Sequence, residues 1–169
     1  MHASICAWVT QLRRKYPKHF DVGCRVLEYG SRDVNGSVRP YFMAPKEYVG
    51  IDCYAGPCVD VVGVAHEYEP KKANFDVVIT TEMLEHDPHW KLTLEHAARM
   101  LRSGGLLILT CAAPKRPPHN HSDSPTPGYY ENRTPAEVVD ELSKHCKWKE
   151  LDAWLERADL DLHCVGIKK

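Results

Sequence analysis

The chain has 169 residues, of which 43% are hydrophobic and 27% are charged, as in one globular domain with a buried core. The formal net charge of −1 excludes long-range attraction to nucleic acid or to an anionic membrane, and no apolar stretch is long enough to span a bilayer. The seven cysteines show no zinc-binding spacing. We therefore predict reduced thiols, no membrane partner and a cytoplasmic protein.

The first part of the chain is predicted to contain a helix followed by two strands. Residues 4–19, within an N-terminal helical segment 1–20, place apolar side chains at helical spacing. Residues 25–29 form an apolar run that reaches an acid and then a glycine, which is typical of a buried parallel strand entering a ligand loop. A short helix is predicted over residues 37–44, and a second strand over 48–52.

The middle of the chain is predicted to alternate between strands and one helix. Further apolar strands are predicted over residues 59–63, 75–80 and 106–110. Asp87 and Pro88 are typical of a helix start, with an N-cap followed by proline at the first helical position. Gly104 and Gly105 are predicted to end that helix.

The C-terminal part begins with a long polar segment, residues 112–133, which is rich in proline and histidine. Its length predicts a functional loop, and we expect a lid over the ligand pocket. Thr134 to Glu137 form a capping box that starts a helix. Residues 147–156 and 160–168 are predicted to form a terminal hairpin. Strands that alternate with helices indicate an α/β fold with a mostly parallel sheet, to which the hairpin adds an antiparallel strand.

Two acidic residues lie at the ends of successive predicted strands. Glu28 and Asp52 would lie at the same edge of a parallel sheet, where an acid at the end of the second strand suits the two hydroxyls of a ribose. Glu28 would favour an amino group, so the pattern predicts an amine-bearing nucleoside ligand. The alternative is that both acids cap turns. The loop lacks a P-loop motif, and Arg32 replaces the second glycine of a dinucleotide-binding motif.

The ordered motifs resemble those of class I S-adenosylmethionine-dependent methyltransferases, in the small branch whose fourth strand leads into a Glu-His pair, here Glu85-His86. The segments that carry the resemblance are Val26–Gly36, Tyr48–Asp52, Phe75–His86 and Leu101–Thr110. The resemblance implies a three-layer Rossmann-like domain over residues 1–169, with a seven-stranded sheet. It also implies S-adenosylmethionine as cofactor and S-adenosylhomocysteine as product.

The resemblance further implies the residues of the cofactor site. The expected contacts are Glu28, Gly30, Ser31 and Arg32 at the methionine end, Asp52 at the ribose, Cys53, Ala65 and His66 at the adenine, and Thr81 and Glu82 near the sulfonium. Two positions depart from the family pattern. The next glycine after Gly30 is Gly36 rather than a closer one, and Val64 stands where such proteins often have an acid.

Candidate catalytic residues follow the fourth strand. An oxygen or nitrogen acceptor can require a general base, and His86 and Glu82 are the candidates; the alternative for His86 is a local packing role. The residues expected to line the acceptor pocket are His119, His121, Tyr129 and Tyr130. We predict no metal site, because the proline-rich loop that carries His119, His121 and Asp123 is a poor preorganised ligand set.

These observations predict methyl transfer to an unidentified acceptor. The near-neutral charge favours a small molecule, while nucleic acid and protein acceptors stay open as alternatives. Two other functions also stay open. One is a non-catalytic domain that binds S-adenosylmethionine as a partner or sensor, and the other is a nicotinamide-dependent oxidoreductase, against which Arg32 argues.

Overall fold

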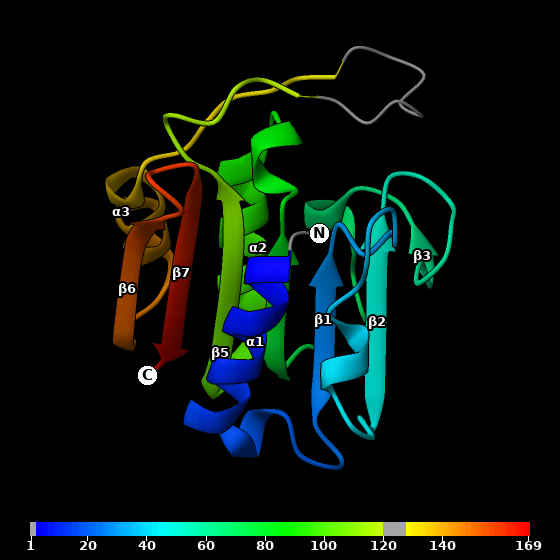
Figure 1. Ribbon diagram of the computed structural model, residues 1–169. Helices are drawn as coiled ribbons and strands as arrows, with labels where there is room; N and C mark the ends of the chain where they lie inside the picture. Colours follow the sequence, from blue (N-terminus) through cyan, green and yellow to red (C-terminus); the bar gives the residue numbers. More distant parts are fainter. Residues whose placement is uncertain (1–2, 120–127) are drawn as a thin grey trace.

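The computed structural model, which describes residues 3–119 and 128–169, contains a single twisted sheet between two layers of helices (Figure 1). In the described residues the sheet has seven strands in the order β3-β2-β1-β4-β5-β7-β6. The strands are β1 (Arg25–Tyr29), β2 (Glu47–Asp52), β3 (Val61–Val62), β4 (Phe75–Thr81), β5 (Leu101–Ala112), β6 (Trp148–Glu156) and β7 (Asp161–Lys168). The strands β1 to β5 pair in parallel, whereas β7 is antiparallel to both β5 and β6.

Helices cover both faces of the sheet, α1 (Ala3–Lys15) on one and α2 (Trp90–Met100) and α3 (Pro135–His145) on the other (Figure 1). Neighbouring residues of a strand point to opposite faces. Val26 therefore packs in the cluster beneath α1, whereas Leu27 packs in the cluster beneath α2 and α3. The described part of the chain contains no helix with the length and apolar character needed to cross a membrane.

The predicted α/β class and the antiparallel terminal hairpin are confirmed. The capping box is also confirmed, because the Thr134 side chain accepts from the backbone N–H of Glu137 while the Glu137 side chain accepts from that of Thr134. The N-terminal helix is shorter than predicted and ends at Lys15, and a 3₁₀ turn over Pro17–His19 follows it. The short helix expected over 37–44 is also a single 3₁₀ turn.

Two predicted helix boundaries are wrong. The helix after β4 begins at Trp90 rather than at Pro88, and Asp87 accepts hydrogen bonds from the backbone of His89 and the hydroxyl of Thr93 without being the N-cap. The glycine pair does not end this helix. The helix ends at Met100, and the pair lies within β5, where Gly104 has a φ of 71° and the pairing with β4 shifts register. The glycines therefore shape a strand irregularity.

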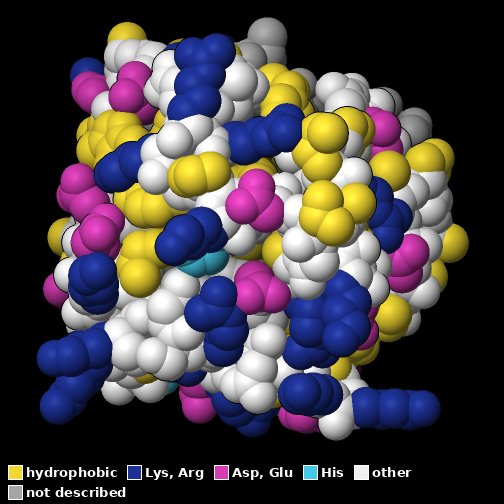
Figure 2. Space-filling view, turned by 90° about the horizontal axis from the view of Figure 1, so that it is seen from below, with side chains coloured by type: hydrophobic (Ala, Val, Ile, Leu, Met, Phe, Trp, Pro, Cys, Tyr) yellow, Lys and Arg dark blue, Asp and Glu magenta, His cyan; other side chains and the backbone are white. Residues whose placement is uncertain are grey.

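The strands β1, β2, β4 and β5 end at the upper edge of the sheet in Figure 1. Because these strands are parallel, the loops that follow them meet at this edge. At the opposite edge, Lys and Arg side chains are interspersed with Asp and Glu side chains (Figure 2). A hollow there of about 490 Å³ has mixed charges on its walls, including Lys46, Glu47 and Lys72, and lies away from the strand ends predicted to bind the ligand.

We expect alanine at Gly30 to lower the free energy of unfolding by about 2–3 kcal/mol. Gly30 has a φ of 70°, and a Cβ there would lie 2.6 Å from Cβ of Met83. The cost combines left-handed backbone strain of about 1–2 kcal/mol with overpacking of about 1 kcal/mol or more. Urea unfolding of the variant measures the loss.

Two other glycines provide controls for Gly30. Gly23 has a φ of 88° but no atom within 4 Å of an added Cβ, so Gly23→Ala isolates the strain and is expected to cost about 1–2 kcal/mol. Gly63 has neither feature, and Gly63→Ala is expected to change stability by less than about 0.5 kcal/mol. Equal losses for Gly30→Ala and Gly23→Ala would contradict the predicted clash.

Candidate active site

The loop after β1 lies between β2 on one side and the loop after β4 on the other. The backbone N–H groups of Gly30 and Ser31 both donate to the carbonyl of Ile51 on β2, at 2.9 and 3.1 Å. On the other side, Gly30 lies so close to Met83 that an added Cβ would clash with it. The loop after β1 thus contacts both β2 and the loop after β4, and most residues predicted to contact the cofactor lie on these loops or at the strand ends before them.

Asp52 ends β2 with its carboxylate half-buried. One oxygen accepts from the backbone N–H of Arg32 at 3.1 Å, and the other accepts from that of Tyr54 at 3.0 Å. An ionised carboxylate has about four acceptor sites, so two remain for ligand hydroxyls. Asp52 thus joins the loops after β1 and β2 and keeps the capacity expected of a ribose-binding acid.

Glu28 lies below the loop rather than on its surface. Its side chain is 2% exposed, and its carboxylate accepts a hydrogen bond from the hydroxyl of Tyr48 at 2.7 Å. Burial raises the pKa of Glu28 to about 8, although the hydroxyl of Tyr48 and the charge of Arg39 act in the opposite direction. Glu28 thus supports the loop from beneath, and its contact with the cofactor stays a prediction.

Protonation of Glu28 makes stability depend on pH. The pKa is about 8 in the folded chain against an ordinary 4.5, so folding takes up a proton between these values and the folded state loses stability as pH rises through this window. We expect Glu28→Gln to reduce the slope of the free energy of unfolding against pH by up to about 1.4 kcal/mol per pH unit. Urea unfolding at several pH values across the window measures the slope, with Glu47→Gln as the control. Parallel wild-type and Glu28→Gln curves would contradict the assignment.

The remaining residues of the loop after β1 pack against β2 and its loop. The Ser31 hydroxyl is buried, has no hydrogen-bond partner in the described part of the chain, and lies against Gly50, where an added Cβ would approach its Oγ to 2.7 Å. The Arg32 side chain lies along Gly56, where an added Cβ would be 3.0 Å from its Cγ. Both side chains thus face β2 and the turn after it.

The residues expected at the adenine lie at the side of this surface. Cys53 is exposed directly after β2, and His66 lies on the 3₁₀ turn η3 (Ala65–Glu67) after β3. The His66 ring packs edge-on against that of His89, with centroids 5.3 Å apart. Its buried Nδ1 makes no hydrogen bond within the described residues. Aromatic and polar atoms beside a half-buried Asp52 fit a bound nucleoside.

Thr81 and Glu82 lie at the end of β4. Thr81 pairs with Thr110 of β5, and Glu82 adopts a left-handed conformation with a φ of 55°. The Glu82 carboxylate accepts from the hydroxyl of Thr110 at 3.1 Å and pairs with Arg116 at 2.7 Å. These contacts give Glu82 the environment of a positioning residue, whereas a general base needs access to the acceptor.

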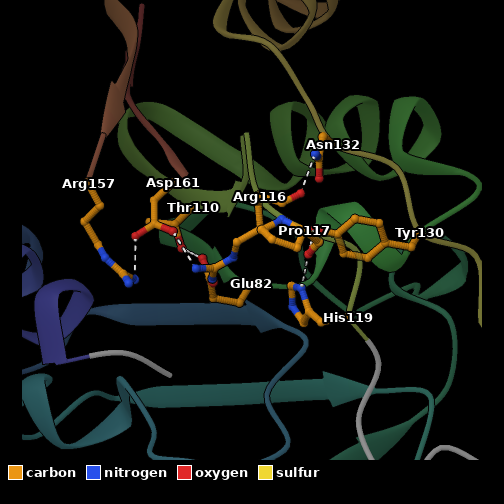
Figure 3. Close-up of polar contacts among 9 residues, drawn as sticks. All are labelled: Glu82, Thr110, Arg116, Pro117, His119, Tyr130, Asn132, Arg157 and Asp161. Carbon is orange, nitrogen blue, oxygen red and sulfur yellow. Dashed lines mark hydrogen bonds and ion pairs between the residues drawn. The ribbon is translucent and has the colours of Figure 1, made fainter. Parts of the chain in front are cut away.

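A buried charge network extends from Glu82 to the start of β7 (Figure 3). Arg116 pairs with Glu82 and, at 3.2 Å, with Asp161, whose side chain is fully buried. Asp161 also pairs with Arg157 at 3.0 Å. The network fixes the segment after β5 against two strand ends. Arg116 and Asp161 could not be predicted from the sequence, because they lie far apart in the chain and no local motif links them.

An aromatic cluster lies beside this network. The ring centroids of His86 and His119 are 5.3 Å apart, and the Tyr130 ring lies 5.3 Å from His86 and 5.0 Å from His119. The structure therefore brings three of the predicted catalytic and acceptor residues together. The side chain of Tyr129 instead contacts Glu131 and Arg133. His121 and Asp123 lie outside the described residues, as does residue range 120–127 of the expected lid.

A Rossmann-like sheet with a glycine turn after β1 and an acid at the end of β2 defines an α/β protein that binds a nucleoside cofactor. A family model described as methyltransferase domain matches residues 1–165. The chain belongs to this methyltransferase domain family, and the resemblance to class I S-adenosylmethionine-dependent methyltransferases is confirmed. No curated protein sequence matches the chain significantly.

Solved methyltransferase structures share the fold. The Haemonchus contortus phosphoethanolamine N-methyltransferase 2, in complex with S-adenosyl-L-methionine, matches with a TM-score of 0.71 and 14% identity over 95% of this chain and 51% of its own. The Burkholderia thailandensis 1,6-didemethyltoxoflavin-N1-methyltransferase, with bound substrate and S-adenosylhomocysteine, has a TM-score of 0.65 and 19% identity over 92% and 76% of the two chains. The N-methyltransferase NodS from Bradyrhizobium japonicum WM9 gives 0.59 and 13% over 94% and 86%. These similarities confirm the predicted fold.

Proposed function

We propose that this methyltransferase binds S-adenosylmethionine across the loops after β1, β2 and β4 and transfers its methyl group to a small molecule. The observation that carries the proposal is the half-buried carboxylate of Asp52, which keeps unused acceptor sites beside the Gly30 loop. This arrangement supports an amine-bearing nucleoside, with the ribose hydroxyls donating to Asp52.

S-adenosylmethionine supplies a methyl group on a positively charged sulfur, which is already activated for transfer. The protein therefore has to hold the cofactor, align the acceptor and exclude water. Asp52 would orient the ribose, while Cys53, Ala65 and His66 would flank the adenine. The backbone at Gly30 would approach the methionine end, and Glu28 would support the loop from below.

The acceptor would lie near His86, His119 and Tyr130, on the side of β4 away from Asp52. His86 is the residue in this cluster that we propose as general base, and Glu82 would hold Arg116 and the segment after β5. Two structural neighbours are named for small acceptors, phosphoethanolamine and 1,6-didemethyltoxoflavin, which supports the same class here. We further propose a cytoplasmic location, because the cysteines of the described residues form no disulfide.

Calorimetry with S-adenosylhomocysteine and a transfer assay test the proposal together. We expect micromolar binding, followed by transfer of labelled methyl from S-adenosylmethionine to a member of a small-molecule mixture containing amines and hydroxylated compounds. Transfer only to protein or only to RNA would overturn the small-molecule assignment. Binding without transfer to any of the three acceptor classes would overturn catalysis in favour of a binding partner or sensor.

A further inference from the structure

Three potential metal ligands from two segments meet beyond the end of β4. Glu85 and His86 lie on the 3₁₀ turn η4 (Leu84–His86), and His119 lies on the segment after β5. One ligand atom from each residue lies within 4.8 Å of the other two. In a tetrahedral site with bonds of about 2.1 Å, ligand atoms are about 3.4 Å apart. Small side-chain rotations would therefore place all three atoms around one ion.

Glu85 is the group that most needs a positive partner. Its side chain is 0% exposed, and neither carboxylate oxygen accepts a hydrogen bond of normal geometry from the described residues. A buried carboxyl group in this position is costly unless a cation or a donor satisfies it.

A backbone carbonyl orients the ring of His119. Its Nδ1 lies 3.3 Å from the carbonyl oxygen of Pro117 (Figure 3). A carbonyl can only accept, so this contact requires the proton on Nδ1 and turns Nε2 away from Pro117. Metal-binding histidines commonly donate their second ring nitrogen to a backbone carbonyl in this way, which fixes the orientation of the ring.

Hydrogen bonds hold the segment that carries His119 near η4. The backbone N–H of Glu131, on the returning part of the same segment, donates to the carbonyl of Glu85 at 2.8 Å. The Asn132 side chain donates to the carbonyl of Arg116 at 2.9 Å (Figure 3). The described residues on both sides of range 120–127 are thus tied to each other and to η4. These bonds hold the segment of His119 against η4, where its ligand atom lies within 4.8 Å of those of Glu85 and His86.

We propose that Glu85, His86 and His119 bind a divalent transition-metal ion of the zinc type. Two imidazoles and one carboxylate favour such an ion over Mg²⁺ or Ca²⁺, which prefer oxygen ligands. Three protein ligands leave an open coordination position for an oxygen of the acceptor. A metal-bound His86 has no lone pair left for a proton, so in the metal-loaded chain it would position the acceptor through the ion instead of acting as general base. The role toward the acceptor rests on the proposed methyl transfer, whereas the binding of the ion does not.

Metal titrations of the full chain after chelator treatment test this site. We expect one Zn²⁺ per chain by calorimetry, and visible Co²⁺ absorption that indicates nitrogen and oxygen ligands. Glu85→Gln and His119→Asn should each weaken Zn²⁺ binding at least tenfold. His145→Asn is the matched control, because the His145 ring pairs with Glu141 on α3 at 3.0 Å, and it should bind Zn²⁺ as the wild type does.

Several results would overturn the metal site. These are the absence of stoichiometric Zn²⁺ binding, equal affinity in wild type, Glu85→Gln and His119→Asn, a preference for Mg²⁺, or a Co²⁺–thiolate band that assigns the ion to an exposed cysteine such as Cys53. Calorimetry of S-adenosylhomocysteine with the same chelated protein separates the two proposals. If the protein does not bind S-adenosylhomocysteine, the proposed function is overturned. The Zn²⁺ affinity tests the metal site whatever the result with S-adenosylhomocysteine.

Discussion

Asp52→Ala is expected to weaken binding of S-adenosylmethionine and S-adenosylhomocysteine at least about 100-fold. A hydrogen bond to a charged group contributes about 1.5–3 kcal/mol, and the two hydroxyls of the ribose would both donate to this carboxylate. The loss of about 3 kcal/mol or more corresponds to two powers of ten in the dissociation constant. The variant also releases the backbone N–H groups of Arg32 and Tyr54, which loosens the loops that line the cofactor. Calorimetry with both ligands measures the effect.

Two further variants separate ligand binding from folding. Asp52→Asn keeps one acceptor oxygen and should give an intermediate affinity. Glu69→Ala removes an exposed carboxylate that pairs with Arg99 on the surface, and should leave the affinity unchanged. Urea unfolding identifies any general loss of structure. A folded Asp52→Ala protein with wild-type affinity would show that Asp52 does not contact the cofactor.

The elements that depend on a few adjacent residues can be predicted from the sequence. β4 and β5 are near-continuously apolar because helices cover both faces of the sheet. The capping box at Thr134 and the turn before β7 also depend on a few adjacent residues. The order of the resembling motifs then predicted the sheet and the edge at which Glu28 and Asp52 lie.

The wrong helix boundaries have a different cause. Gly104 and Gly105 have the composition of a helix end, but the pairing of Leu101 with Phe75 extends β5 back to the helix and places both glycines inside a strand. Hydrogen bonding to a neighbouring strand thus overrides the local preference. Asp87 similarly lies before the start of the helix, where its side chain accepts a hydrogen bond from the backbone N–H of His89.

Only those site residues whose positions depend on a neighbouring strand could be predicted from the sequence. Asp52, at the end of β2, and Glu82, directly after β4, were predicted because their positions depend on the adjacent strand. The contacts of Arg116 with Asp161, and of His119 with the residues of η4, depend on how two distant segments return to one edge. No spacing in the sequence encodes that return.

Arg116→Met is expected to lower the free energy of unfolding by about 3–5 kcal/mol. The Arg116 side chain is 10% exposed and lies between the carboxylates of Glu82 and Asp161, which are 15% and 0% exposed. Its removal leaves two buried carboxylates close together, and the remaining partner of Asp161, Arg157, is itself partly exposed. Breaking a buried pair from one side costs this much because the other charge stays buried. Urea unfolding measures the loss.

Lys115→Met is the matched control, because Lys115 precedes Arg116 and pairs with Asp159 at the surface, where both side chains are exposed. It should cost less than about 1 kcal/mol. Glu82→Gln combined with Arg116→Met should recover part of the loss, since it removes one of the uncompensated charges. Because Arg116 anchors the segment that carries His119 and Tyr130, we also expect Arg116→Met to lower methyl transfer more than S-adenosylhomocysteine binding. Equal stability of the Arg116→Met and Lys115→Met proteins would mean that the network does not hold this segment.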